Sequence, residues 1–276
     1  MRARTGLLFV PYLLLLLAFL VVPIAGLVEI SARNQSVTSI GGVGLTMANY
    51  QRVFEGFYLD IIFDTVRLAA IATLIGATLA YPLAYVIVRS QPLARTVLTC
   101  LVMVPLMTSV VVKVFGWFIL LGRGGPAVRM LQKLGIEVQT LLNTEPSVVV
   151  GLVEFALPFM VFSLVPALDR ISPAVEEAAA NLGATPFQTF RLVILPLSAS
   201  GLTSGALLCF GISSSAYVVP AIMGGHAVRM IAQQIYDDVL VAFDWPAAAA
   251  FSIALLVLLS VLIFAALRAS RRATDV

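Results

Sequence analysis

Apolar residues in this 276-residue chain gather into six blocks of about 20 residues, separated by polar segments. A helix rises 1.5 Å per residue, so a block of this length crosses the ~30 Å hydrocarbon core of a bilayer. The pattern therefore predicts an all-α polytopic membrane protein with six transmembrane helices. The predicted spans are residues 7–28, 65–88, 96–121, 147–168, 199–223 and 246–267.

Basic residues are unequally divided between the two sides that these spans separate. The side holding both termini carries nine lysines and arginines, whereas the longer loops of the opposite side carry six. The positive-inside rule therefore predicts cytoplasmic N and C termini. Arg2 and Arg4 before an apolar run imitate a signal peptide, but the run is long and has no A-x-A-like site, so we expect it to be retained. On the outer side, Asp244 is placed to cap the sixth span.

Composition agrees with a membrane protein and excludes several function classes. Hydrophobic residues make up 61% of the chain, charged residues 11%, and the mean hydropathy is +1.04. The net charge of +3 is scattered, which argues against nucleic-acid binding. Cys100 and Cys209 lie inside apolar blocks and are predicted to be free thiols. With a single histidine, His226, and no clustered acids, the sequence predicts neither a metal site nor an enzyme active site. It contains no G-x-x-x-x-G-K-[ST] loop for ATP.

The segment between the fourth and fifth spans predicts two short helices joined by a turn. Ser172 is placed to cap the first helix, with Pro173 at its first position. Gly183 is placed to end it in a left-handed conformation. Thr185 and Gln188 have the spacing of a capping box for the second helix.

The second short helix places Phe187, Phe190 and Ile194 on one predicted face. An amphipathic element of this kind lies on the bilayer interface, or it docks in a groove of a soluble partner. The spacing of the residues alone favours neither interpretation.

A sequence signature separates the two interpretations. Glu177-Ala178-Ala179, followed at fixed spacing by Gly183, Val193 and Leu195-Pro196, resembles the EAA signature of ABC importer permeases, with Val193 where isoleucine is usual. The resemblance implies the type I ABC importer permease (MetI-like) fold. It also implies that the second short helix is a coupling helix docking on an ATPase subunit. The coupling residues carried over by position are Glu177, Ala178, Ala179, Gly183, Phe187, Phe190 and Arg191.

Other stretches look like the spermidine/putrescine permease branch, namely residues 81–85, 104–109, 120–125, 157–160 and 217–225. This resemblance implies a bacterial inner-membrane complex with two ATPase subunits, a second homologous six-helix permease and a periplasmic substrate-binding protein. ATP and Mg would be held by the ATPase subunits, and no cofactor by this chain.

The resemblance also implies a division of the chain. Residues 1–64 would form the first span and a periplasmic loop, 65–268 an ABC transmembrane core domain of five helices with its coupling loop at 169–198, and 269–276 a cytoplasmic tail. The expected cargo is a polyamine or a similar small amine. Relatives importing ferric iron, phosphonate, opines or other small organic solutes leave alternatives open, as does an ATP-independent secondary transporter or channel.

Ionisable and hydroxyl groups inside the predicted spans indicate a substrate pathway. Lys113, Glu154 and the serines Ser213, Ser214 and Ser215 are predicted to lie in one layer, ~10–15 Å below the outer surface. Tyr217 follows directly. Charges at this depth usually face a protein interior or water. Glu154 would then meet a cationic substrate. Alternatively, Lys113 and Glu154 form an ion pair that only ties two helices together, or Lys113 reaches the outer interface.

Overall fold

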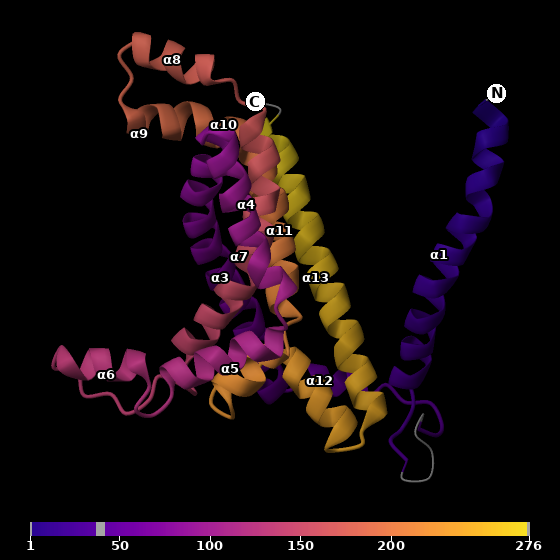
Figure 1. Ribbon diagram of the computed structural model, residues 1–276. Helices are drawn as coiled ribbons and strands as arrows, with labels where there is room; N and C mark the ends of the chain where they lie inside the picture. Colours follow the sequence, from indigo (N-terminus) through magenta and orange to yellow (C-terminus); the bar gives the residue numbers. More distant parts are fainter. Residues whose placement is uncertain (1, 37–41, 275–276) are drawn as a thin grey trace. The chain divides into compact units, whose positions relative to one another are not determined.

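The computed structural model describes residues 2–36 and 42–274, with side chains for 15–36 and 42–268, and this part of the chain is helical without any named strand (Figure 1). The all-α prediction is confirmed. The helices are α1 (Arg2–Ser31), α2 (Ala48–Val53), α3 (Gly56–Arg89), α4 (Pro92–Met107), α5 (Val110–Leu121), α6 (Pro126–Lys133), α7 (Glu145–Asp169), α8 (Pro173–Asn181), α9 (Pro186–Thr189), α10 (Leu195–Leu197), α11 (Ala199–Ser214), α12 (Ile231–Leu240) and α13 (Trp245–Thr274), with π-helical turns η1 (Phe190–Ile194) and η2 (Pro220–Gly224).

The chain forms two compact units. The first comprises Met1–Ile62 and Gln234–Leu258, and the second comprises Phe63–Gln233 and Leu259–Val276. The predicted tail, 269–276, continues α13 as far as Thr274, and residues 275–276 lie outside the described residues.

Several helices have the length and hydropathy of membrane spans. Within the described residues, four segments qualify, Gly56–Arg89, Val110–Lys133, Glu145–Asp169 and Trp245–Arg268. A fifth candidate is the pair Pro186–Leu197 and Ala199–Ser214, which is bent by 70°. The chain therefore crosses a membrane several times, and the count of six stays a prediction.

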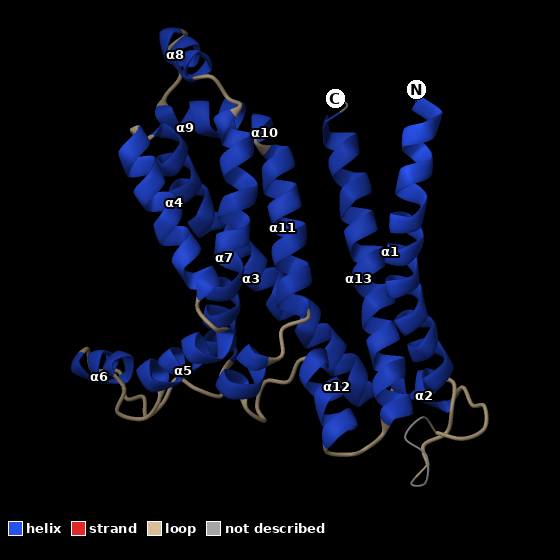
Figure 2. Ribbon diagram, turned by 45° about the vertical axis from the view of Figure 1, so that its right-hand side comes forward, coloured by secondary structure: helices blue, strands red, loops and turns tan. Residues whose placement is uncertain are grey.

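The third predicted span, 96–121, is not one helix. The helix α4 ends at Met107, and Thr108 and Ser109 have extended backbone, with ψ angles of 136° and 134°. Pro105 in the last turn of α4 lacks an N–H, and hydroxyl side chains compete for backbone hydrogen bonds. Interrupting the helix here therefore sacrifices few backbone hydrogen bonds and costs little free energy. In both views α4 runs alongside α7, while α5 and α6 lie across the end of the bundle (Figures 1 and 2).

The fifth predicted span, 199–223, is also interrupted. The helix α11 ends at Ser214, and a short non-helical segment precedes η2. The hydroxyls of Ser214 and Ser215 bond back to the carbonyls of Phe210 and Gly211, at 2.7 and 3.0 Å. Such back-bonding weakens the end of a helix because it competes with the next backbone donors.

The core of the second unit lies where α7 packs against α11, and glycines let the two helices approach closely. A Cβ at Gly205 would lie 2.7 Å from the Met160 sulfur, and one at Gly201 would lie 2.9 Å from the Ser163 carbonyl. Cys209 is a free, buried thiol on the same contact, bonded to the Ala156 carbonyl at 3.3 Å. Cys100 is free and exposed, so both cysteine predictions are confirmed.

The first unit is held together by polar contacts around the start of α13. Asp244 accepts a hydrogen bond from the Ala247 amide at 3.1 Å, the predicted cap, and pairs with Arg52 at 2.8 Å. The hydrogen bond to Asp244 raises the pKa of Arg52. Nearby, burial raises the pKa of Asp238, whose Oδ1 accepts a hydrogen bond from the Gln234 amide.

Candidate functional site

The loop between α7 and α11 has the local structure that its sequence predicts. The Ser172 hydroxyl accepts from the Ala174 amide, and Pro173 opens α8. The capping box of α9 is complete, since Thr185 Oγ1 accepts from the Gln188 amide at 3.3 Å and Gln188 Oε1 accepts from the Thr185 amide at 2.8 Å. Both short helices are therefore fixed at their starts by contacts within three residues.

Gly183 ends α8 with a φ of +85°, and a Cβ there would have open space around it. The requirement for glycine is therefore a backbone one.

We predict that Gly183→Ala lowers the stability of the purified protein by about 1–2 kcal/mol, the usual cost of a left-handed alanine. Gly76→Ala is the matched control, because a Cβ at Gly76 also meets open space but the residue lies inside α3. That control should leave stability unchanged or raise it by about 0.5–1 kcal/mol. Thermal unfolding in detergent measures both. Equal midpoints for Gly183→Ala and the wild type would contradict the assignment.

The second short helix continues through a π-helical turn and then bends sharply. The amide of Leu195 bonds to the Phe190 carbonyl, five residues back, and the segment Pro186–Leu197 meets Ala199–Ser214 at 70°. A π turn accommodates Pro196, which has no N–H for the regular ladder. We call residues 173–197, which comprise α8, α9, η1 and α10, the arm; it joins α11 at an angle.

The predicted common face of Phe187, Phe190 and Ile194 is wrong. Phe187 is 69% exposed, whereas Ile194 is buried and Phe190 packs edge-to-face on Tyr81, with ring centroids 5.1 Å apart. Phe190 and Ile194 both line the cavity beside α3, whereas Phe187 does not, so Phe187 is the residue that leaves the predicted face. Glu177, Ala178 and Arg191 are exposed, and Ala179 is half-buried.

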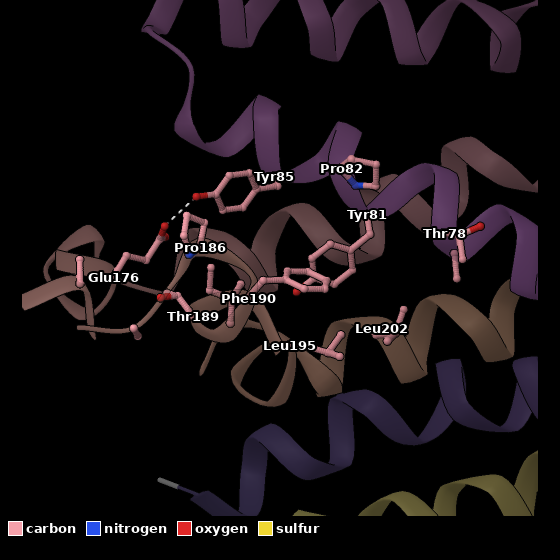
Figure 3. A pocket seen from close by; sticks show the side chains of 14 residues that line it. Thr78, Tyr81, Pro82, Tyr85, Glu176, Pro186, Thr189, Phe190, Leu195 and Leu202 are labelled. Atoms are coloured by element: carbon pink, nitrogen blue, oxygen red, sulfur yellow. Dashed lines mark hydrogen bonds between the residues drawn. The ribbon is translucent and has the colours of Figure 1, made fainter. Parts of the chain in front are cut away.

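Sequence reasoning missed the residue that ties this loop to α3. Glu176 accepts a hydrogen bond from the Tyr85 hydroxyl at 2.6 Å (Figure 3) and from Arg89 Nε at 2.9 Å, and it pairs with Arg89 Nη2. The same Arg89 nitrogen donates to the Ile171 carbonyl at 3.0 Å. We call Tyr85, Arg89 and Glu176 the latch. Because Arg89 and Glu176 stand 87 residues apart, no local pattern marks the contact.

A cavity of about 730 Å³ lies between α3 and the arm, next to the latch. Figure 3 shows Tyr81, Pro82 and Tyr85 on one side and Pro186 and Phe190 on the other. The Tyr81 hydroxyl bonds to Ser198 at 2.6 Å, at the bend between the arm and α11. The arm therefore contacts α3 at two places, the latch and the Tyr81–Phe190–Ser198 contact, with a space between them.

At the opposite end of the unit, Lys113 of α5 and Glu154 of α7 form an ion pair, with Nζ 3.0 Å from Oε1. The Lys113 ammonium also lies 5.6 Å from the centroid of the Phe155 ring. The predicted approach of these two charges is observed, although α5 lies across the bundle rather than along it (Figure 2).

The predicted hydroxyl groups are divided. Ser213 and Ser214 are fully buried, whereas Ser215 is exposed. Ser215 and Tyr217 line a cavity of about 360 Å³ together with Phe155 and Val110, which neighbour Glu154 and Lys113 in the chain. The structure thus brings Lys113, Glu154, Ser215 and Tyr217 to one region and turns Ser213 and Ser214 inward.

Comparison with known families identifies the fold's relatives. A family model described as binding-protein-dependent transport system inner membrane component matches residues 7–275. The chain belongs to this family. It is therefore an ABC importer permease, which agrees with the EAA-like loop.

The similar curated proteins include polyamine permeases. The chain is 32% identical to the spermidine/putrescine transport system permease protein PotB of Haemophilus influenzae, over 93% of this chain and 90% of the relative. It is 30% identical to PotB of Escherichia coli, over 93% and 94%. The inner membrane ABC transporter permease protein YdcU of Escherichia coli is 33% identical over 78% of this permease. The permease thus belongs to the polyamine branch of the family.

Solved structures share the fold. A chain of a bacterial alginate ABC transporter, in complex with an alginate pentasaccharide-bound periplasmic protein, superimposes with a TM-score of 0.76 at 21% identity, covering 99% of this permease and 96% of that chain. A chain of the inward-facing MetNI methionine ABC transporter gives 0.57 at 21% identity, covering 82% and 96%. These support the predicted MetI-like fold.

Proposed function

We propose that this permease is one of two unlike six-helix subunits that form the pathway of an ATP-driven importer for a polyamine or a similar small amine. One of the two ATPase subunits docks on the arm of this permease, and a periplasmic binding protein delivers the solute at the end carrying α5 and α6. The observation that carries the proposal is the arm, capped at the starts of both α8 and α9, with Phe187 exposed at the start of α9. Its amine specificity is supported by the PotB relatives and by Glu154, a carboxylate whose side chain is 25% exposed and whose chain neighbour Phe155 lines a cavity.

The mechanism is alternating access. Closure of the ATPase dimer would move the arm, and the arm would move α3 through the latch and α11 through the bend at Ser198. The permease makes and breaks no covalent bond, and acts as a two-state element biased from both ends. ATP and Mg belong to the ATPase subunits.

Reconstitution tests whether import needs the complete ATP-driven complex. In proteoliposomes, this permease together with the second permease, the ATPase subunits and the binding protein should import labelled putrescine or spermidine only with ATP inside. The permease alone should import none. Uptake by the permease alone, driven by an ion gradient, would support a secondary transporter or channel instead.

Glu154→Gln tests the cargo class in the same complete complex. Since the variant keeps the size of the side chain and removes its charge, uptake of cationic amines should fall about tenfold or more, the loss of one charge-assisted hydrogen bond. If uptake and preference were unchanged across cationic, anionic and neutral solutes, Glu154 would not be a contact for the substrate.

A further inference from the structure

The ion pair between Lys113 and Glu154 is unevenly exposed. The Lys113 side chain is 12% exposed and the Glu154 side chain 25%. Among the residues that the structure describes, Glu154 is the only ion-pair partner of Lys113. The Glu154 carboxylate is thus the more accessible member of the pair, and the Lys113 ammonium that neutralises it belongs to the more buried side chain.

Two residues that line the cavity of about 360 Å³ are close to this pair in the sequence. Phe155, which lines it, follows Glu154 on α7, and Val110 precedes Lys113 by one turn of α5. Tyr217 and Ser215 complete the side contributed by the end of α11 and the segment after it. The pair is linked to this cavity through Phe155, since the Lys113 ammonium lies 5.6 Å from the centroid of the Phe155 ring and 3.0 Å from the Glu154 carboxylate.

A cationic solute does not meet Glu154 as an unpaired carboxylate, because Lys113 already pairs with it. The carboxylate and the ammonium sum to zero charge, so an incoming ammonium gains little unless Lys113 withdraws. Lys113 is able to withdraw because its four-carbon stem is flexible and its ammonium already lies over the Phe155 ring, whose face attracts a cation. Exchange of one ammonium for another leaves the carboxylate paired throughout.

We propose that Lys113 is a specificity-determining residue, a resident cation that occupies Glu154 in the empty permease and that the ammonium of the substrate must displace. This inference rests on the proposed function, because it takes Glu154 to be the contact for the substrate. A tethered group acts at an effective concentration on the order of millimolar. Solutes that offer a single ammonium and no further contacts therefore fail to compete, whereas longer amines that also fill the cavity succeed.

The test is Lys113→Gln in the complete reconstituted complex. If the pair is closed in nine of ten empty molecules, it raises the apparent dissociation constant about tenfold. Lys113→Gln should therefore lower the putrescine concentration for half-maximal uptake about tenfold, and methylammonium should become an inhibitor. Lys113→Arg, which keeps a resident cation, should retain the wild-type concentration and resist methylammonium. In a Glu154→Gln background, Lys113→Gln should have no further effect.

Chemical rescue supplies a second measurement in case Lys113→Gln weakens the fold by leaving Glu154 unpaired. Methylammonium should raise the thermal unfolding midpoint of the Lys113→Gln complex and leave that of the wild type unchanged. If Lys113→Gln neither lowers the half-maximal concentration nor responds to methylammonium, the inference is overturned. If instead Glu154→Gln leaves amine uptake unchanged, the proposed cargo contact has failed, which is a separate result.

Discussion

Replacing Phe187 with aspartate is expected to prevent the ATPase subunits from assembling on this permease while leaving the permease itself folded. Phe187 is 69% exposed and lies at the start of α9, next to its capping box. Exposed aromatics that fill a pocket on a partner are typical hot spots, and truncating one costs about 2 kcal/mol or more, a loss of about 30-fold in affinity. Aspartate adds the cost of burying a charge in that pocket.

Co-purification of tagged permease with its ATPase subunits measures this effect. Phe187→Leu should retain assembly, because it keeps an apolar side chain. Met130→Asp is the matched control, since Met130 is equally exposed but lies on α6, at the end of the unit opposite the arm (Figure 1). Normal assembly of Phe187→Asp would show that the ATPase binds elsewhere.

Phe190→Asp separates docking from internal packing. Because the Phe190 ring packs on Tyr81, its loss should loosen the arm and lower the unfolding midpoint of the permease alone. Phe187→Asp should leave that midpoint unchanged. The resemblance groups the two phenylalanines as contacts, and the structure gives them different surroundings.

Local features of the coupling loop were predictable because they act between residues close in sequence. The Ser172 cap, the left-handed Gly183 and the capping box of Thr185 and Gln188 each depend on three or four neighbouring residues. The π turn was not predictable from the same residues. It forms where the arm meets α11, and there Ile194 is buried and Phe190 packs on Tyr81, a residue of α3.

Hydropathy predicted the apolar blocks but not the continuity of the backbone within them. Thr108 and Ser109 interrupt the third block, and Ser215 the fifth, although none of them lowers the mean hydropathy enough to mark a boundary. The proximity of Lys113 and Glu154 was predicted from depth along two upright helices. The structure brings them together by a different route, with α5 turned across the end of the bundle.

Breaking the latch is expected to uncouple ATP hydrolysis from transport. In the latch, the Glu176 carboxylate accepts hydrogen bonds from Tyr85 and Arg89. Arg89 also donates a hydrogen bond to the Ile171 carbonyl at the start of the loop. Arg89 and Glu176 are each 21% exposed. Glu176→Gln or Arg89→Gln should weaken the contact by about 1.5–3 kcal/mol, the usual value for hydrogen bonds to charged groups. The arm would still present Phe187 to the ATPase, but its movement would no longer be passed to α3.

The ratio of ATP hydrolysed to solute imported measures this effect in proteoliposomes. Both latch variants should assemble normally and hydrolyse ATP, with uptake reduced about tenfold or more, since each 1.4 kcal/mol corresponds to a factor of ten. Asp169→Asn is the matched control. It removes the pair between Asp169, the last residue of α7, and Arg95 of α4, but that pair is largely exposed and is worth about 0.2–1 kcal/mol.

A double-mutant cycle distinguishes coupling through the latch from two independent defects. If Arg89 and Glu176 act on each other, Arg89→Gln combined with Glu176→Gln should reduce uptake no more than either change alone. Additive losses would mean that each residue acts through a different partner. If both single variants kept wild-type uptake and an unchanged ratio of ATP hydrolysed to solute imported, the latch would not be the link between the arm and α3. Movement would then have to reach the spans through the bend at Ser198, where Tyr81 makes the other contact between α3 and the arm.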